Sequence, residues 1–152
     1  MNTSAQVRSS FPNSAFGPPV SAQVISEVEA ELGHELPQVL RDLYLNFDGF
    51  MGPLNTPFLF PLRERPTEMQ ESLLSFTRFL RDEDYCPPWL HRAVAVGGDG
   101  GGSAWFVLLE TPDCVVRWEA EWGPEYEQLE GSLLDVWLSK KSVFESLLPR
   151  DA

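Results

Sequence analysis

The sequence predicts an α+β fold, in which a single domain contains a twisted, mainly antiparallel sheet of about four to five strands packed by N-terminal, middle and C-terminal helices. Apolar residues recur at helical spacing near both ends of the chain and again near its middle. Between the middle and last of these segments, runs rich in Val, Trp and Phe are separated by short turn-forming stretches, as in an antiparallel meander. The chain has 152 residues, 43% of them hydrophobic, which matches one globular domain with one core.

The beginning of the chain is rich in Ser, Asn, Ala and Pro. This composition predicts a flexible N-terminal arm over residues 1–20, pinned by Phe11 or Phe16 to a domain formed by residues 21–152.

Two helices are predicted next, the first from Ser21 to Leu32 and the second with Pro37 in its first turn. Gly33 ends the first helix, and Asp48-Gly49 ends the second. The apolar faces of the two helices are formed by Val24, Ile25, Val28 and Leu32, and by Leu36, Leu40, Leu43, Tyr44 and Phe47.

Prolines flank a short strand predicted around Phe58 to Leu62, which places this strand at a sheet edge. A middle helix is predicted over residues 67–81, because Thr67-Glu68-Met69-Gln70 fits a capping box and apolar residues follow at helical spacing. A polar loop with the sequence DEDYCPP follows this helix.

Residues 94–110, VAVGGDGGGSAWFVLLE, contain five of the eleven glycines and raise the question of a phosphate-binding loop. Such a loop needs Lys-Ser/Thr after its last glycine and then a helix, whereas an aromatic and branched run that favours a strand follows Gly102. Gly98 to Gly102 is therefore predicted to connect a hairpin. The strands of the meander are expected at about 92–97, 103–110 and 114–119, with Thr111-Pro112-Asp113 as the second turn.

The segment SLLDVWLSKKSVFESLL predicts a C-terminal helix. Ser132 and Asp135 resemble a helix start. The side chains expected to face inward are Leu134, Trp137, Leu138 and Phe144.

The chain is strongly acidic, with 11 basic and 23 acidic residues and a formal charge of −12. This charge repels phosphates, so neither nucleic acid nor an anionic membrane is an expected partner, and it favours steering toward a cationic protein surface. Acidity also serves solubility alone, so the charge by itself leaves both interpretations open. No secretory signal or membrane span is recognisable, and a cytoplasmic location is expected.

The two cysteines, Cys86 and Cys114, form neither a disulfide framework nor a zinc cluster. Cys86 and His91 make an isolated C-x4-H pair, and His34 lies far away in the sequence. No metal and no cofactor are expected.

Four blocks occur in order along the chain: ISEVEAELGHELPQVLRDLYLNFDGF, VAVGGDGGGSAWFVL, CVVRWEAEW and SLLDVWL. In order and spacing, over residues 24–140, they resemble the SUKH superfamily, which includes fungal cell-wall-assembly regulators and bacterial toxin-immunity proteins. The chain departs from the family pattern at Phe50-Met51-Gly52, where many members have more glycine, and at Leu134 and Val136, where aromatics are usual. The resemblance implies an α+β fold without catalytic residues, and action by binding, the bacterial members typically blocking the active site of a neighbouring toxin.

Asp48-Gly49 and Asp99 each have two interpretations. Asp48-Gly49 is either a ligand loop or the stop that a turning helix needs, and Asp99 is either a cation ligand or a turn-forming residue. A calcium loop requires several spaced oxygens and a terminal Glu, which the glycine turn lacks. We therefore favour structural roles for both.

Residues 119–130, EAEWGPEYEQLE, contain five glutamates and no basic residue. Glu119 and Glu121 would share a face if the strand continued, as a glycosidase pair requires, but nothing in this acidic run holds them at a defined distance in a cleft. No catalytic residue is assigned. The run is either a solvated acidic edge with Trp122 folded onto the core or a surface that binds a partner.

The hypothesis from sequence is a non-enzymatic immunity protein of bacterial competition that binds and neutralises a cognate toxin, such as a nuclease with a cationic active-site cleft. The alternatives are a regulatory or scaffold protein of the same fold without a toxin partner, and a small acidic hydrolase. The predicted binding residues are Asp82, Glu83, Asp84, Glu119, Glu121, Trp122, Glu125, Tyr126 and Glu127.

Overall fold

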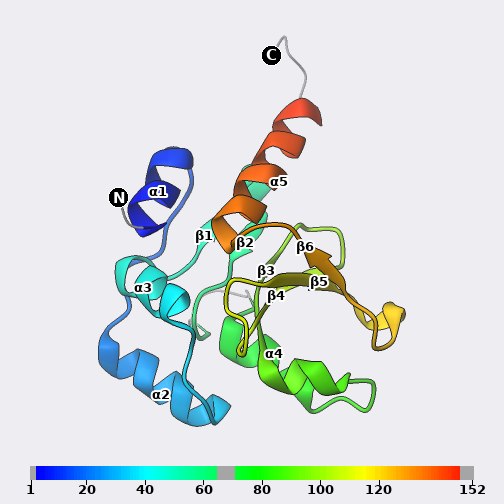
Figure 1. The fold of residues 1–152 in the computed structure, drawn as a ribbon. Helices are drawn as coiled ribbons and strands as arrows, with labels where there is room; N and C mark the ends of the chain where they lie inside the picture. The colour runs from blue at the N-terminus through cyan, green and yellow to red at the C-terminus, as the bar shows by residue number, and fades with distance from the viewer. Residues whose placement is uncertain (1–2, 65–70, 148–152) are drawn as a thin grey trace.

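The computed structural model, which describes residues 3–64 and 71–147, places helices on both faces of a four-stranded antiparallel sheet (Figure 1). The α-helices are α1 (Thr3–Ser10), α2 (Ala22–Leu32), α3 (Gln38–Asn46), α4 (Leu73–Arg81) and α5 (Leu133–Leu147). The strands are β1 (Phe50–Met51), β2 (Pro57–Leu59), β3 (Ala93–Gly98), β4 (Ala104–Leu108), β5 (Val115–Trp118) and β6 (Glu127–Leu129). Short 3₁₀ helices are η1 (Pro53–Asn55), η2 (Pro88–Arg92) and η3 (Ala120–Trp122). The predicted α+β class is confirmed.

The large sheet has the order β3-β4-β5-β6, so each strand pairs with the next in the chain and the predicted meander is confirmed. Strands β1 and β2 form a separate antiparallel pair. A hydrogen bond from Phe60 N to Val96 O (2.8 Å) links the segment after β2 to β3. The strand predicted around Phe58 to Leu62 corresponds to β2, which ends earlier, at Leu59. The sequence pattern did not predict β1 and β6.

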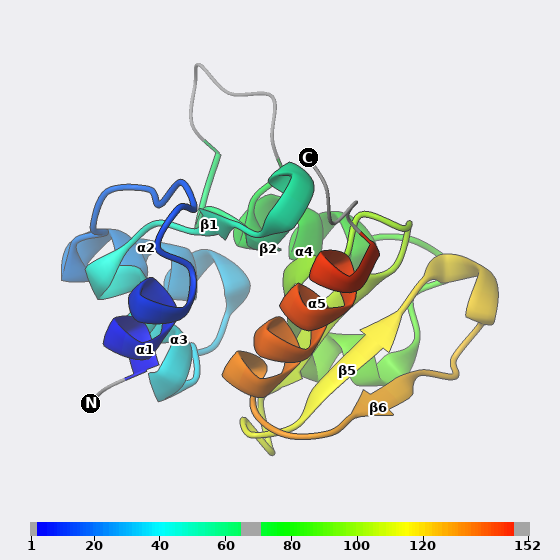
Figure 2. The same ribbon diagram turned by 90° about the horizontal axis from the view of Figure 1, so that it is seen from above.

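Alternate residues of the large sheet enter two different apolar clusters, because successive side chains of a strand point to opposite faces. One face carries Trp105, Val107 and Val115 and is covered by α5, whereas Phe106 and Val116 belong to the cluster on the other face. Figure 1 shows the sheet between α5 above and α4 below, and Figure 2 shows α5 lying across the sheet.

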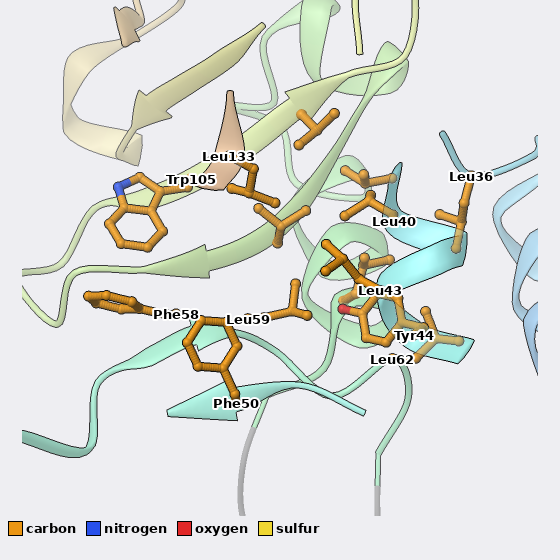
Figure 3. Packing of buried hydrophobic residues seen from close by; sticks show 14 of the residues in the cluster. Leu36, Leu40, Leu43, Tyr44, Phe50, Phe58, Leu59, Leu62, Trp105 and Leu133 are labelled. Carbon is orange, nitrogen blue, oxygen red and sulfur yellow. The ribbon is translucent and has the colours of Figure 1, made fainter. Parts of the chain in front are cut away.

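The larger cluster combines leucine side chains with aromatic rings (Figure 3). The ring of Phe58 contacts Phe50 and Trp105 edge to face, with centroids 6.1 and 5.2 Å apart. Two buried polar groups find acceptors: the Tyr44 hydroxyl donates to Phe60 O (2.7 Å), and Trp137 Nε1 donates to Phe58 O (2.9 Å). The second bond ties α5 to β2.

Helices α2 and α3 follow the predicted pattern. Ile25, Val28 and Leu32 of α2 are buried, and Gly33 ends this helix in the left-handed region. In α3, Leu40, Leu43 and Tyr44 are buried, and Pro37 immediately precedes the helix.

Helix α1 lies within residues 1–20, where the sequence did not predict a helix. Val7 and Phe11 are buried, and Phe16 stacks on Phe50, so both predicted pinning residues contact the core. Propensity alone did not indicate α1, because tertiary contacts supply much of the stability of a short helix.

The start of α4 and the inward face of α5 require corrections. Ser72 and Ser75 form a reciprocal capping box before α4, so the helix begins at Leu73 rather than continuing from residue 67. The predicted capping box at Thr67 lies outside the described residues. In α5, Leu138 is 37% exposed rather than inward, whereas Leu133 is buried. None of the helices in the described ranges is long and apolar enough to span a bilayer.

Candidate partner-binding surface

Asp99 organises the glycine turn between β3 and β4. Its Oδ1 accepts a hydrogen bond from Gly101 N (2.9 Å), and Gly100 has φ +83°, in the region that favours glycine. Asp99 Oδ2 lies 3.8 Å from a nitrogen of Arg117 and 3.8 Å from Lys140 Nζ. The carboxylate therefore faces protein cations, which supports the turn-forming role.

The Asp48-Gly49 pair also has a structural role. Asp48 Oδ1 accepts a hydrogen bond from Leu62 N (2.7 Å). Gly49 has φ +82°, and a Cβ there would lie 2.6 Å from Leu59 O. The chain thus needs glycine where it turns from α3 toward β1.

Glu119 and Glu121 do not alternate on one strand. Strand β5 ends at Trp118, Glu119 immediately precedes η3, and Glu121 lies within that 3₁₀ turn. Glu119 is half-buried, with Oε2 close to Gly102 of the glycine turn, whereas Glu121 is exposed. The strand geometry that motivated the glycosidase test is therefore wrong.

Trp89 of η2 contacts both the acidic segment, residues 119–130, and the sheet. Its Nε1 donates to Pro124 O (3.0 Å), and its ring lies 5.0 Å from that of Tyr126 and 5.7 Å from that of Trp118. Trp118 Nε1 in turn donates to Gly123 O (2.7 Å). Sequence analysis missed Trp89, although a tryptophan after two prolines in a polar loop was an available signal.

The loop that carries Asp82, Glu83 and Asp84 lies between α4 and η2. Because Trp89 connects η2 to Pro124, the two predicted acidic segments lie at one end of the molecule, at the right in Figure 1. Asp82 is the C-cap residue of α4 and is exposed, as is Asp84, whereas Glu83 is half-buried.

The two proposed aromatic anchors differ in environment. Trp122 is half-buried, and the Arg117 guanidinium carbon lies 5.1 Å from the centre of its ring. Arg117 also pairs with Glu127 (3.2 Å), which partly neutralises that carboxylate. Tyr126 is 39% exposed and rests on Trp89, so it presents the more accessible anchor.

Exposed carboxylates occur both in the segment that carries Tyr126 and in the loop after α4. Glu121 and Glu125 make no ion pair within residues 3–64 and 71–147, and neither do Asp82 and Asp84. Their charge is therefore available to a partner. We call the residues at this end the acidic surface: Asp82, Asp84, Trp89, Glu121, Glu125 and Tyr126.

Two neighbouring grooves lie near the turn between β4 and β5, and Tyr126 lines the smaller of them. The smaller, about 300 Å³, is lined by Trp89, Arg92, Leu108, Glu110, Thr111 and Tyr126. The larger, about 820 Å³, is lined by Thr111, Pro112, Asp113, Cys114, Gln128, Leu129, Glu130, Gly131 and Ser132. Thr111 borders both, so the grooves adjoin at the β4–β5 turn.

Arg81, the last residue of α4, links the end of α2 to the start of β3. Its guanidinium donates to Ala93 O (2.8 Å), to His34 Nε2 (2.8 Å) and, at 3.4 Å, to Leu32 O. Burial lowers the pKa of Arg81 from its ordinary value. The guanidinium stays charged, because that value lies far above neutral pH.

Cys86 does not have the properties of a nucleophile or a metal ligand. Its Sγ lies 3.7 Å from His91 Nε2, but burial raises the pKa of the thiol despite the nearby Arg81. The described residues contain no group of three or more His, Cys, Asp or Glu side chains placed to hold a metal ion.

Comparison with known proteins identifies the family of the chain. No curated protein matches the sequence. The model of the SMI1/KNR4 family (SUKH-1) matches residues 19–140, which include α2 to β6 and the start of α5. Because this match covers most of the chain, the protein belongs to the SMI1/KNR4 (SUKH-1) family.

Proposed function

We propose that this protein acts by binding, as a cytoplasmic immunity protein whose acidic surface occupies the cationic active-site cleft of a cognate toxin. Family membership supports a toxin-immunity or cell-wall-assembly role. The observation that carries the proposal is the exposed pair Glu121 and Glu125 in the same segment as Tyr126, whose ring packs on Trp89.

The two components of this surface have different physical effects. Unpaired carboxylates on a protein of formal charge −12 attract a cationic cleft from a distance and raise the association rate. An aromatic side chain that becomes desolvated in a pocket slows dissociation instead. We therefore expect substitutions of the carboxylates to change mainly the association rate, and substitutions of the aromatic anchors to change mainly the dissociation rate.

The immunity proposal predicts a toxin-like gene beside the gene of this protein, and the test measures binding kinetics to the product of that gene. The double variant Glu121→Lys/Glu125→Lys should associate at least about tenfold more slowly at low salt, and the difference should shrink as salt rises. Tyr126→Ala and Trp122→Ala should mainly raise the dissociation rate, with a loss of about 2 kcal/mol for the dominant anchor.

A double reversal elsewhere provides the control. Asp42→Lys/Glu64→Lys changes the net charge equally, at exposed carboxylates in α3 and after β2 that make no ion pair with the residues the structure describes. Wild-type kinetics in all folded variants of the acidic surface would place the interface elsewhere.

Two other functions make different predictions. A regulatory or scaffold protein would lack an adjacent toxin gene, and its loss would alter cell-wall assembly rather than toxin resistance. A hydrolase would show turnover that Glu119→Gln abolishes. We expect no turnover, because Glu119 lies half-buried beside the glycine turn and not opposite Glu121 on a shared strand face.

A further inference from the structure

Strand β6 is the terminal strand of the large sheet. It pairs with β5 on one side, and its other side forms the outer margin of the sheet in Figure 2. The last part of the acidic run, Glu127–Leu129, therefore lies along a sheet edge. An open edge presents backbone N–H and C=O groups that another extended chain can pair with.

The hydrogen-bond alternation of the sheet identifies which groups point outward. Leu108 N donates to Cys114 O, so this carbonyl points toward β4, whereas Cys114 N donates to Thr111 O within the turn. The alternate strand residues Val116 and Trp118 therefore direct their backbone groups toward β4. The intervening residues Val115 and Arg117 consequently face β6.

Their partners on β6 follow from the register. Leu129 pairs with Val115, and Glu127 pairs with Arg117, so both direct their backbone groups inward to β5. Gln128, between them, directs its N–H and C=O away from β5. Gln128 is exposed, which leaves this donor and acceptor accessible at the edge.

The adjoining grooves provide space for side chains of an added strand. Gln128 and Leu129 line the larger groove, and Tyr126 lines the smaller one. In strand addition, backbone hydrogen bonds supply affinity, and pockets for alternate side chains supply specificity.

Charge selects among the chains that could pair here. Glu125 and Glu130 flank β6, are exposed and make no ion pair within the described part of the chain. A second copy of this protein would bring the same carboxylates into opposition, which is unfavourable. A strand carrying lysine or arginine would place cations beside them.

We propose that a partner protein adds an extended, basic strand to the edge of β6, with its backbone paired to the N–H and C=O of Gln128. If the partner is the toxin, strand addition is the way in which the acidic surface recognises it, and to that extent this inference rests on the proposed function. Its physical basis, the open edge, can be tested without a toxin.

The first test uses a capped synthetic peptide of alternating valine and lysine, titrated into the full-length protein and followed by NMR. We expect saturable binding with the largest shift at the Gln128 amide. The same peptide N-methylated at alternate residues keeps its charge but loses hydrogen-bond donors, and it should bind at least about tenfold more weakly. Equal binding of the two peptides would overturn the proposal, since charge alone would then explain it.

The second test changes the protein. Gln128→Pro removes the outward N–H without breaking a bond to β5, and proline is tolerated at that position of an edge strand. It should fold and bind the lysine peptide at least about tenfold more weakly, whereas Gln128→Ala keeps the N–H and should bind within about twofold of wild type. Wild-type affinity in Gln128→Pro would overturn the proposal. A dimer of the wild-type protein, detected by light scattering and dissociated by Gln128→Pro, would also overturn the proposal, because a second copy would then occupy the edge.

The two proposals can fail separately. If the neighbouring gene product does not bind wild-type protein but the peptide results hold, the toxin assignment fails and the edge site stands. If the toxin binds Gln128→Pro as tightly as wild type, the edge mode fails and the immunity function stands.

Discussion

Gly100 shows how one backbone angle fixes residue identity. It has φ +83°, and a Cβ added there would meet only Thr56, at 3.7 Å, so the angle rather than crowding disfavours other residues. Gly100→Ala should lower the free energy of unfolding by about 1–2 kcal/mol. Gly33 tests the same cause at a second site, because it has φ +85° and an added Cβ there would meet nothing within 4 Å. Denaturant titration of Gly33→Ala should give a similar loss, and an unchanged stability in both variants would contradict this explanation.

Tyr44 predicts a pH dependence of stability. Burial, and to a smaller extent the charge of Asp48, raise its pKa well above the ordinary 10.0. Above that pH the unfolded chain releases the proton while the folded protein retains it, so stability is full below pH 10 and falls as pH rises, by up to about 1.4 kcal/mol per pH unit.

Tyr44→Phe isolates this effect. At neutral pH the variant should be about 1–3 kcal/mol less stable, because Phe60 O loses its donor. Its stability should then fall less steeply than that of wild type between pH 10 and 11.5, as measured by urea titration at several pH values. Parallel pH profiles for the two proteins would show that Tyr44 does not titrate as proposed.

Single residues were predictable where local geometry or sequence spacing decides their role. Gly33 and the turn residue Asp99 are examples, because the end of a helix and a tight turn each demand particular residue types. The role of Trp89 depends on Pro124, 35 residues away in the sequence, and that of Arg117 depends on how the chain after β5 folds back to bring Trp122 and Glu127 to it. No local pattern contains such partners.

At the scale of elements, burial predicts that leucines in and just before α3 contribute unequally to the free energy of unfolding. Leu43 is fully buried, Leu36 precedes the helix and is 4% exposed, and Leu45 is 43% exposed. Leu43→Ala and Leu36→Ala should each lower the free energy of unfolding by about 2–5 kcal/mol. Leu45→Ala should change it by about 0.5 kcal/mol or less. Thermal and urea unfolding test this order, and a stable Leu43→Ala variant would contradict the core described here.

Elements differed in how far the sequence predicted them. The longer helices and the strands β3, β4 and β5 contain enough apolar residues at helical or strand spacing to be predicted from the sequence. Strands β1 and β6 have only two and three residues, and pairing with neighbours defines them. This is why the acidic run was predicted as a charged segment but not as part of a sheet edge.

For the whole molecule, the N-terminal segment contributes to the core although the family match begins at residue 19. The Phe11 ring lies 5.2 Å from that of Phe50 and 5.8 Å from that of Phe58. Phe11→Ala should therefore lower the free energy of unfolding by about 3–5 kcal/mol. Phe79→Ala, at a phenylalanine that is 54% exposed, is the control and should have little effect. Equal stability of the two variants would show that the packing of the N-terminal segment does not contribute to the free energy of unfolding.

The hydrogen bonds of Arg81 have a consequence for the thermodynamics of association. They bind Arg81, which directly precedes Asp82, to the end of α2 and the start of β3, and backbone hydrogen bonds from Asp82 N and Glu83 N continue the order into the loop. A loop that is already ordered loses little conformational entropy when it meets a partner. Calorimetry should therefore give a heat-capacity change proportional to the buried area alone, without the additional contribution of folding coupled to binding.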